Sequence, residues 1–498
     1  MPDTTRPHVI IFNPDQWRGD VMGHLGNPAA VTPNLDAWVR SDAVSFRQAF
    51  CQNPVCTPSR CSFMTGWYPH VRGHRTMHHM LRQDEPVLLK ALKDAGYFVW
   101  WGGKNDLVPG QHGYAHACDV KHRADKPTLR NTHRDLGWRG PADGDNYFSF
   151  YLGKLDTPKD DSAYLDFDWA MVHGALRFLE DPPRDKPLCL YVPISYPHPP
   201  YAVEEPFYSM IARGKLPPRT PTPRGPDGTP WAGKPSLLKG IAEGQRLQGW
   251  TEDRWTELRA TYYGMCARVD HQFGLLLAAL KKAGLYDDAV IFFFADHGDF
   301  AGDYGLVEKA QNTFEDCLVR VPFLIKPPRG APVKPGVRDG LVELIDLVAT
   351  VEALTGVAMP QDHFGRSLAP LLASEKAEHR DAVFAEGGRR IGERQAMELE
   401  SLKSNFPDGL YWPRLRLQVS DEGVHHTKAT MCRTRQHKYV RRLYEPDELY
   451  DLGKDPAEVR NVAADPAYRD VLAGLKERML SWYQETCDVV PRETDKRG

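Results

Sequence analysis

The sequence predicts an α/β fold, in which a large, mostly parallel sheet is flanked by helices and a smaller C-terminal α+β part follows. Short apolar runs alternate with segments of helical period through most of the chain, which is the order of a parallel sheet with covering helices. The run Ile291-Phe292-Phe293-Phe294 is apolar throughout, as in strands covered on both faces. Because the pattern changes after about residue 375, we predict an α/β domain over 1–375 and a smaller domain over 376–498.

Five runs are predicted to be strands because they are apolar and rich in β-branched or aromatic residues. They are residues 8–12, 97–101, 188–194, 289–294 and 319–325. Helical spacing and helix-start signals predict the intervening helices. One begins near Thr32-Pro33, and the others cover 59–65, 85–95, 167–180, 251–283 and 341–354. Between about 106 and 165 most of the chain has no assignment.

Two further stretches complete the coarse prediction. Residues 216–235 are dense in Pro and Gly and are predicted to be a long loop, a lid or rim near His198. In the C-terminal part, residues 431–444 alternate like an antiparallel strand or hairpin, and Asp465-Pro466 opens a final helix.

Composition sets broad limits on the class of protein. Hydrophobic residues make up 41% of 498 and charged residues 26%, which is typical of a soluble globular protein. A net charge of -3 offers no general attraction for nucleic acid or an anionic membrane, and no apolar run is long enough to span a bilayer. The start of the chain lacks the pattern of a signal peptide, and nine irregularly spaced cysteines do not indicate a disulfide framework. We therefore expect a cytoplasmic protein.

Polar side chains follow four of the predicted strands at the point where each strand ends. Asp15-Gln16 follows the first strand, Lys104 the second, His198 the third and Asp296-His297 the fourth. Because ligands of parallel α/β sheets bind beyond the carboxyl ends of the strands, we expect these residues to share one site.

A second signal is the segment Cys56-Thr57-Pro58-Ser59-Arg60, which ends in Thr65-Gly66. Pro58 suits the first turn of a helix and Gly66 its end, so Cys56 is predicted to lie at or just before a helix N-terminus, where an anion is favoured. Arg60, about one turn further on, could point back at the same anion. The alternative for an isolated cysteine is a buried structural role in a turn.

This segment resembles the signature of the type I, formylglycine-dependent sulfatases of the alkaline phosphatase superfamily, close to its phosphonate monoester hydrolase branch. The resemblance implies an alkaline-phosphatase-like fold and oxidation of Cys56 to formylglycine, which works as the aldehyde hydrate. It also implies a metal site and a set of catalytic residues. The implied metal ligands are Asp15, Gln16, Cys56, Asp296 and His297, and the implied catalytic residues are Cys56, Arg60, Lys104, Asp106, His198 and Lys309.

The residue types suit those roles. Carboxylate and amide oxygens favour Ca²⁺, with Mg²⁺ as an alternative, and the imidazole of His297 also admits Mn²⁺. His198 is the implied acid for the leaving group, with help from Lys309. The family commonly has His where this chain has Asp106, which could deprotonate the hydrate or bind the substrate. Residues 448–452 with Asp455-Pro456 resemble the family's C-terminal signature.

The resemblance implies hydrolysis of sulfate esters to sulfate and an alcohol. One alternative is a phosphonate monoester or phosphodiester hydrolase of the same superfamily, but Lys104 favours a sulfatase because a tyrosine is expected there in those relatives. A non-catalytic sulfatase-like binding protein is less favoured, since Cys56, Arg60 and the metal residues are all present. The expected partners are a small-molecule or saccharide sulfate ester, a formylglycine-generating or sulfatase-maturating enzyme and, as one alternative, a second copy of this chain.

Two groups of residues are left with open interpretations. Tyr411, Trp412, Arg414, His425 and His426, in the insert 389–430, are predicted to shape a leaving-group pocket, with a solvated loop as the alternative. His70, His74, His78 and His79 have spacings that invite a zinc site, but Pro69 and Gly73 interrupt any helix there, which favours surface or pocket-lining histidines.

Overall fold

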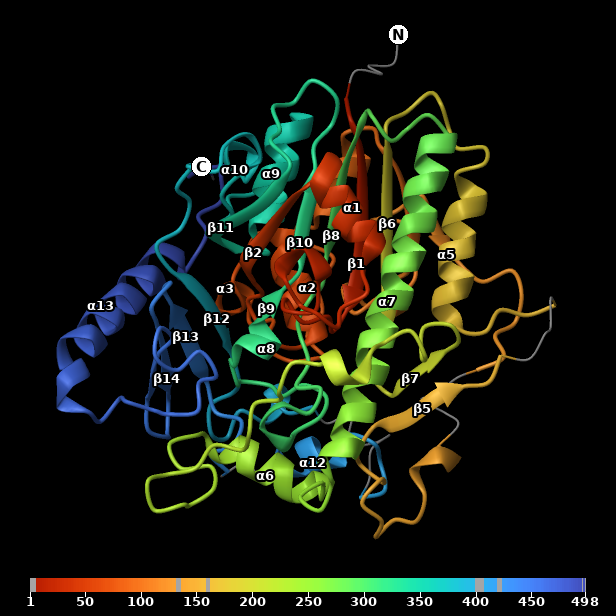
Figure 1. Ribbon diagram of the computed structural model, residues 1–498. Helices are drawn as coiled ribbons and strands as arrows, with labels where there is room; N and C mark the ends of the chain where they lie inside the picture. Colours follow the sequence, from red (N-terminus) through yellow and green to blue (C-terminus); the bar gives the residue numbers. More distant parts are fainter. Residues whose placement is uncertain are drawn as a thin grey trace.

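The computed structural model describes residues 6–130, 136–157, 162–398, 407–418, 423–494 and 496–497. A nine-stranded sheet runs through its centre, in the order β11-β2-β10-β8-β1-β6-β3-β4, with β9 paired to β2 (Figure 1). β10 runs antiparallel to β2 and β8, whereas β1 is parallel to both β6 and β8, so the predicted mostly parallel sheet is confirmed. Its strands are β1 (His8–Asp15), β2 (Val44–Phe50), β3 (Phe98–Gly102), β4 (Val120–His122), β6 (Leu188–Pro197), β8 (Ala289–Phe294), β9 (Arg320–Val321), β10 (Phe323–Lys326) and β11 (Gly336–Glu343).

Helices bury the sheet. β8 is buried at every position, as its unbroken apolar sequence predicts. The helices form two packed groups. In one, α7 (Glu252–Lys282) contacts α1 (Pro33–Ser41) and α5 (Phe167–Phe178). In the other, α2 (Cys56–Thr65) contacts α4 (Leu88–Asp94) and α9 (Asp346–Thr355). The remaining short elements are α3 (Pro69–Arg72), α6 (Ser236–Gln245), α8 (Asp316–Val319), α10 (Ala369–Ala373), α12 (Trp412–Leu415), β5 (Tyr151–Leu155) and β7 (Tyr201–Glu204).

Several predicted boundaries were wrong. The helix predicted over 341–354 begins only at Asp346, because residues up to Glu343 extend β11 in parallel register with β2. The strand predicted over 319–325 is broken at Pro322, which has no N–H to donate to a ladder. α4 is shorter than the predicted 85–95. β2 and α6 were not predicted. β2 was missed because the half-buried Arg47 and Gln48 interrupt its apolar pattern.

A four-stranded antiparallel sheet with one long helix forms the C-terminal part. Its strands are β12 (Val383–Gly387), β13 (Ala429–Arg433), β14 (His437–Arg442) and β15 (Glu448–Asp451), in chain order. Helix α13 (Arg469–Thr486) packs on it through Trp482, whose ring stacks on Phe384 at 4.5 Å. The predicted hairpin and final helix are confirmed. The boundary near residue 375 stays a prediction, because an apolar cluster of this part also contains Tyr68 and Ile345.

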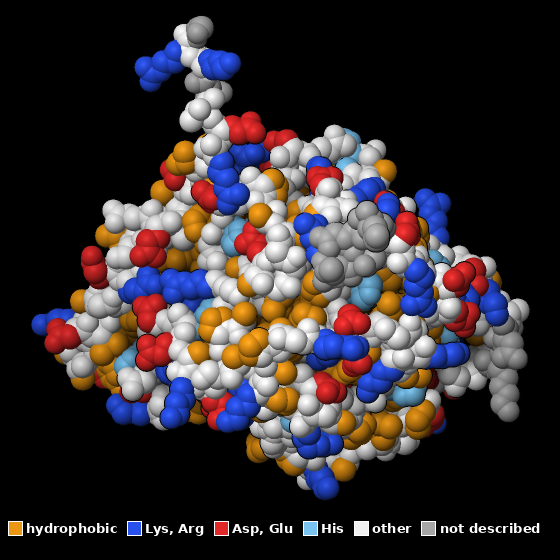
Figure 2. Space-filling model, turned by 90° about the horizontal axis from the view of Figure 1, so that it is seen from above, with side chains coloured by type: hydrophobic (Ala, Val, Ile, Leu, Met, Phe, Trp, Pro, Cys, Tyr) orange, Lys and Arg blue, Asp and Glu red, His pale blue; other side chains and the backbone are white. Residues whose placement is uncertain are grey.

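The face of the molecule seen from above carries charges of both signs (Figure 2). Figure 2 shows Lys and Arg side chains interspersed with Asp and Glu on the face seen from above, in keeping with the net charge of -3. Within the described ranges, every helix is too short or too polar to cross a membrane.

A buried cluster of ion pairs links the C-terminal sheet to the part of the chain that contains the central sheet. Lys438 Nζ on β14 lies 2.7 Å from Asp316 and also pairs with Glu458, and its side chain is 1% exposed. We expect Lys438→Met to lower the free energy of unfolding by about 3–5 kcal/mol, because it leaves two buried carboxylates without this partner. Urea unfolding followed by tryptophan fluorescence measures it. Lys454→Met, which removes an exposed lysine paired with Asp451, is the matched control and should change the unfolding midpoint little; an equal shift in both variants would contradict the prediction.

Candidate active site

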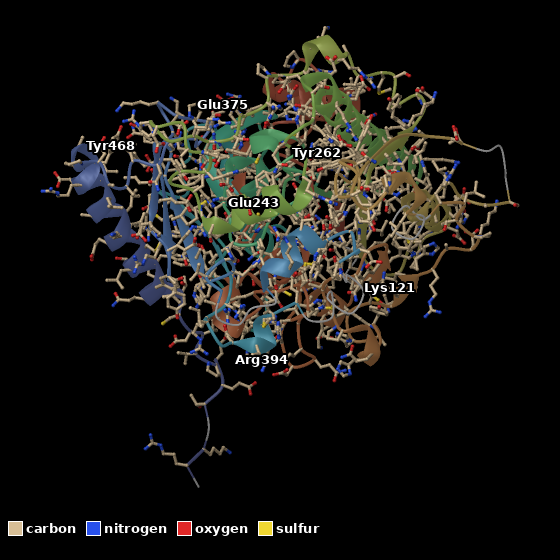
Figure 3. The ribbon with its side chains drawn as sticks, turned by 90° about the horizontal axis from the view of Figure 1, so that it is seen from below. Lys121, Glu243, Tyr262, Glu375, Arg394 and Tyr468 are labelled. Carbon is tan, nitrogen blue, oxygen red and sulfur yellow. The ribbon has the colours of Figure 1, made fainter. Side chains whose placement is uncertain are left out.

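The predicted strand-end residues meet at the carboxyl edge of the central sheet. β1 ends at Asp15, and Gln16 follows it in a left-handed conformation with φ 73°. Asp296 lies just beyond β8, and its Oδ1 accepts the backbone N–H of Gln16 at 3.1 Å. Because β1 and β8 are parallel neighbours, these two ends lie side by side. Figure 3 views the molecule from below, with α6, which carries Glu243, near the middle of the view.

Cys56 lies at the centre of this edge, as the first residue of α2. Its Sγ is 3.2 Å from His297 Nε2, 3.5 Å from Lys104 Nζ and 3.6 Å from Asp15 Oδ1. Burial, together with the negative charge of Asp15, raises the pKa of the Cys56 thiol. The unmodified side chain is therefore a neutral thiol, which is a poor nucleophile.

Four side chains around Cys56 form a group suited to a divalent cation. Asp15, Cys56, Asp296 and His297 each place one ligand atom within 4.8 Å of all the others. The Nδ1 of His297 is 3.0 Å from the Gly298 carbonyl, which can only accept, so Nδ1 carries the proton and the lone pair of Nε2 faces the group. Burial also lowers the pKa of His297, which keeps the imidazole neutral as a ligand must be. Gln16 Oε1 accepts a hydrogen bond from Lys309 at 2.8 Å, and the predicted role of Gln16 as a ligand stays a prediction.

Arg60 holds the two carboxylates of this group in place. Its side chain is fully buried, and Nη2 lies 2.9 Å from Asp15 Oδ2 and 2.8 Å from Asp296 Oδ2. Burial works against ionisation of Asp15, but Lys104, His198 and Arg60 outweigh it and lower the pKa of Asp15 well below its usual value. The guanidinium thus occupies one oxygen of each carboxylate and leaves the other directed toward Cys56. The predicted contact of Arg60 with a bound anion stays a prediction.

Two lysines flank the cysteine. Lys104 Nζ pairs with Asp15 at 2.6 Å and with Asp106 at 2.9 Å, while Asp106 itself has a positive φ of 40°. Lys309 Nζ lies 2.9 Å from His198 Nε2 and 2.9 Å from Glu308 Oε1. Although burial opposes the charge, Cys56, Glu308 and Asp15 raise the pKa of Lys309, so this ammonium stays protonated.

Sequence reasoning missed the acidic group beneath this site. Asp299 accepts hydrogen bonds from Tyr201 Oη at 2.7 Å and from Gln16 Nε2 at 2.6 Å. Burial raises the pKa of Asp299 to about 7, and Glu308 adds to the effect. Asp299 comes two residues after His297 in the same loop, which is the one sequence signal for it. Glu308, whose φ is 67°, was missed because nothing local marks a positive-φ glutamate beside a lysine.

The predicted insert does approach the site. Arg414, on α12, lies 3.9 Å from Glu308 through Nη1 and 3.9 Å from Glu398 through Nη2. Among the described residues its buried Nε and Nη1 have no hydrogen-bond acceptor. Tyr411 is packed against Phe150, and His425 is hydrogen-bonded to Ser236 instead of facing the lysines. A leaving-group pocket here stays a prediction.

Three histidines of the run after α2 are held by contacts within the protein. His70 pairs with Glu386 at 2.6 Å, His74 with Glu85 at 2.9 Å, and His79 with Thr76 at 2.6 Å. In the ranges that the structure describes, the one group of three or more candidate metal ligands is that around Cys56. The 216–235 loop is anchored on Asp303, whose Oδ1 accepts the N–H of Thr220 at 2.7 Å, and its role as a lid or rim near His198 stays a prediction.

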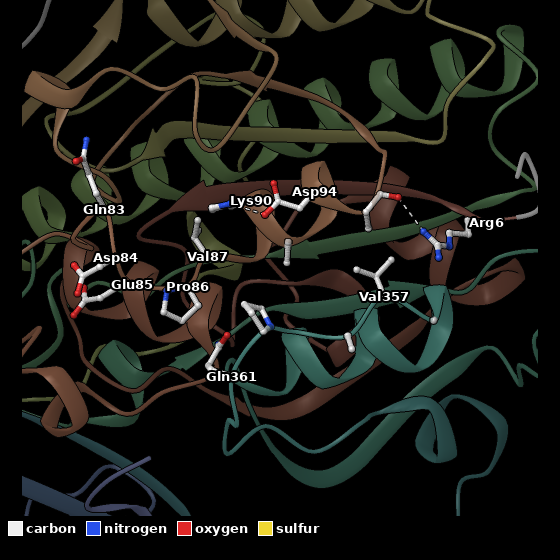
Figure 4. A pocket seen from close by; sticks show the side chains of 15 residues that line it. Arg6, Gln83, Asp84, Glu85, Pro86, Val87, Lys90, Asp94, Val357 and Gln361 are labelled. Carbon is white, nitrogen blue, oxygen red and sulfur yellow. Dashed lines mark hydrogen bonds and ion pairs between the residues drawn. The ribbon is translucent and has the colours of Figure 1, made fainter. Parts of the chain in front are cut away.

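A separate cavity lies between residues 83–95 and residues 356–361 (Figure 4). It is lined by α4 and by residues 356–361, next to Arg6, which precedes β1. Its charged side chains are already engaged, since Lys90 pairs with Asp94 and Arg6 donates to the Ala95 carbonyl. This cavity therefore lacks the convergent polar groups of a catalytic site.

Comparison with known proteins decides the family. The sulfatase family model matches residues 7–357, which include every strand end that carries a candidate residue. The chain belongs to the sulfatase family. This sulfatase is thus an enzyme of the sulfuric ester hydrolase class, and the resemblance based on Cys56 to Arg60 is confirmed.

The sulfatase is similar along almost its whole length to characterised proteins and solved structures. It is 27% identical to the multifunctional alkaline phosphatase superfamily protein PehA of Trinickia caryophylli, over 96% of this chain and 95% of that one. It is 25% identical to an ulvan-active sulfatase of Formosa agariphila, over 96% and 81%. The phosphonate monoester hydrolase of Agrobacterium radiobacter has the same fold, with a TM-score of 0.73, 24% identity and 97% and 96% coverage.

Proposed function

We propose that this sulfatase hydrolyses sulfate monoesters through a formylglycine formed from Cys56, with one divalent cation, and releases sulfate and an alcohol. The observation that carries the proposal is the position of Cys56 Sγ. It lies within hydrogen-bond range of Lys104, of Asp15 and of a neutral His297, at the N-terminus of α2. A nucleophile there faces cations and helix N–H groups, which stabilise the charge of a sulfuryl group.

The reaction uses the two hydroxyls of the aldehyde hydrate in turn. One hydroxyl oxygen attacks sulfur, the bond between sulfur and the ester oxygen breaks, and the leaving alcohol takes up a proton. The second hydroxyl then loses its proton, and the bond between carbon and the sulfated oxygen breaks, which restores the aldehyde and frees sulfate. Water adds to the aldehyde to restore the hydrate. A thiol would leave a sulfur-bound adduct without this internal route of release.

The neighbouring side chains have distinct parts in this scheme. Lys104 and Lys309 supply positive charge for the sulfuryl oxygens, and we assign to Asp106, which pairs with Lys104, the acceptance of a proton from the hydrate. His198 Nδ1 faces the Pro199 carbonyl at 2.6 Å, so a neutral His198 accepts at Nε2 from Lys309. The proton that the leaving alcohol takes up is therefore the one that Lys309 shares with His198 Nε2.

The metal that this site suits is a hard cation once residue 56 carries oxygen. Ca²⁺ is our first choice, with Mg²⁺ and Mn²⁺ as alternatives. A divalent ion would neutralise the crowding of anionic oxygens and favour the ionised form of the hydrate. Asp15, Asp296 and His297 would hold it, while Arg60 keeps both carboxylates oriented.

The oxidation of Cys56 needs a partner, a formylglycine-generating or sulfatase-maturating enzyme. Every residue of α2 is buried, from Cys56 to Thr65. A modifying enzyme could not reach the thiol in the folded protein, so we propose that it acts on the chain before folding is complete.

The first test is a substrate screen. We expect kcat/KM of the converted enzyme to be higher for aryl and sugar sulfates than for a phosphodiester or a phosphonate monoester, because Lys104 adds a cation suited to a sulfuryl group. The same metal residues are compatible with the alternative, a phosphonate monoester or phosphodiester hydrolase. A phosphonate or phosphodiester that is favoured by orders of magnitude in kcat/KM would replace our proposal with that alternative.

The second test concerns the insert. Arg414 is buried next to Glu308, and among the described residues its Nε and Nη1 have no hydrogen-bond acceptor, so we expect it to bind hydroxyl groups of the leaving alcohol. Arg414→Met should raise KM for a sugar sulfate by about tenfold, the scale of one charged hydrogen bond, and change KM for a hydroxyl-free aryl sulfate much less. Arg416→Met is the matched control, because Arg416 donates to the Gly240 carbonyl on α6. Equal losses on both substrates would contradict the specificity role of Arg414.

A further inference from the structure

The cysteine that precedes the aldehyde completes a second kind of metal site. We propose that the unconverted chain binds a thiophilic divalent cation such as Zn²⁺ through Asp15, Cys56, Asp296 and His297. The converted enzyme, which has oxygen in place of sulfur, loses this preference. The inference rests on the metal site of the proposed function and not on the sulfate ester reaction.

The spacing of the donor atoms fits a small tetrahedral ion. Cys56 Sγ lies 3.2 Å from His297 Nε2 and 3.6 Å from Asp15 Oδ1, and Nε2 lies 3.8 Å from Asp15 Oδ1 and 3.8 Å from Asp296 Oδ1. Tetrahedral zinc, with bonds of about 2.0–2.3 Å to nitrogen, oxygen and sulfur, separates its ligand atoms by roughly 3.3–3.5 Å. Shifts of a few tenths of an ångström therefore bring these four pairs to zinc spacing, and all the ligand atoms lie within 4.8 Å of one another.

Each donor is already oriented by a partner on its far side. Arg60 takes the Oδ2 atoms of Asp15 and Asp296, while Asp15 Oδ1 lies 3.6 Å from Cys56 Sγ and Asp296 Oδ1 accepts the backbone N–H groups of Gln16 and His297. The Gly298 carbonyl sets the tautomer of His297. Such supporting contacts are a regular feature of zinc sites in proteins. Gln16 is excluded from this set, because its amide is held by Lys309 and Asp299.

The chemistry of the donor atoms also favours a soft ion in the unconverted form. On binding, the S–H bond of Cys56 breaks, a sulfur–metal bond forms, and the proton leaves to solvent. The resulting site has two carboxylates and one thiolate against two flanking cations, Arg60 and Lys104, so a divalent ion changes its total charge from −1 to +1. Calcium instead prefers six to eight oxygen ligands and gains little from sulfur. Conversion of Cys56 thus changes both the nucleophile and the metal that the site selects.

Cobalt(II) provides the spectroscopic test, on unconverted protein made in a host that lacks the maturation enzyme and freed of metal. We expect Co²⁺ to give a sulfur-to-cobalt charge-transfer band and Zn²⁺ to abolish it, with Zn²⁺ bound at least roughly 100-fold more tightly than Ca²⁺. Cys56→Ser should lose the band. Cys61→Ser, which alters a second buried cysteine of α2, should keep it. A wild-type cobalt complex without the band, or an unchanged band in Cys56→Ser, would overturn the inference.

X-ray absorption of the zinc-loaded wild-type protein provides a second measurement that needs no variant. We expect one sulfur neighbour at about 2.3 Å. A shell of oxygen and nitrogen alone would refute sulfur ligation even if Cys56→Ser failed to fold. Because neither measurement uses turnover, the inference can fail while converted enzyme hydrolyses sulfate esters, and it can hold when that activity is absent.

Discussion

Cys56→Ser is expected to lower steady-state turnover by roughly 10⁴-fold or more, the scale on which removal of an activated nucleophile acts. Serine supplies one hydroxyl where the hydrate has two. Its oxygen can attack sulfur once, but no second hydroxyl is present to expel sulfate from the adduct. Steady-state kinetics should therefore show an almost inactive enzyme, and intact-protein mass spectrometry should show one sulfuryl group retained at residue 56.

Cys61→Ala is the matched control for this prediction. Cys61 is buried on the same helix, but the described contacts link it to neither Lys104 nor His297. That variant should keep its activity and carry formylglycine at residue 56. An active wild-type preparation in which residue 56 is only unmodified cysteine would disprove the mechanism. Peptide mass spectrometry and activity must be measured on the same sample, because a host without the maturation enzyme yields inactive protein.

Asp296→Ala is expected to lower metal affinity by more than about 100-fold and to abolish activity. Asp296 supplies one inward oxygen of the proposed metal site, and its carboxylate also binds Arg60 and the N–H groups of Gln16 and His297. Its loss leaves Arg60 with Asp15 as its one carboxylate partner, so we also expect a loss of about 3 kcal/mol in the free energy of unfolding. Elemental analysis and circular dichroism of the same sample separate the two effects.

Asp303→Ala tests whether any buried acid in this loop would have the same consequence. Asp303 pairs with Arg18 at 2.7 Å, and both side chains are 6% exposed, but it is outside the metal group. It should lose a similar amount of stability and keep full metal content. Full metal occupancy in Asp296→Ala, or equal loss of metal in both variants, would show that the cation binds elsewhere.

Local chemistry explains why so much of the site was predictable from the sequence. The abrupt change from Ile291-Phe292-Phe293-Phe294 to Asp296-His297 marks a strand end whatever surrounds it, and parallel strands bring such ends to one edge. Pro58 suits the first turn of the helix and Gly66 its end, and α2 ends where it was predicted to, although it begins at Cys56 and not at residue 59. The Asp15 and Asp296 positions follow from the same periodicity.

What the tertiary structure alone decided depends on contacts between distant segments. Sequence could not show that Arg60 would bind both carboxylates, since its partners lie 45 and 236 residues away. Nor could it show that Lys309 would donate a hydrogen bond to the side-chain amide of Gln16. It also could not show that Asp299 would contact Gln16 and that Glu308 would pair with Lys309. β10 also runs against its neighbours, because sheet pairing and not local propensity sets its direction. By itself the sequence determined which reactive side chains follow the strand ends, because strand ends are marked by the local pattern of apolar and polar residues. The packing of distant segments decided which of these side chains contact one another.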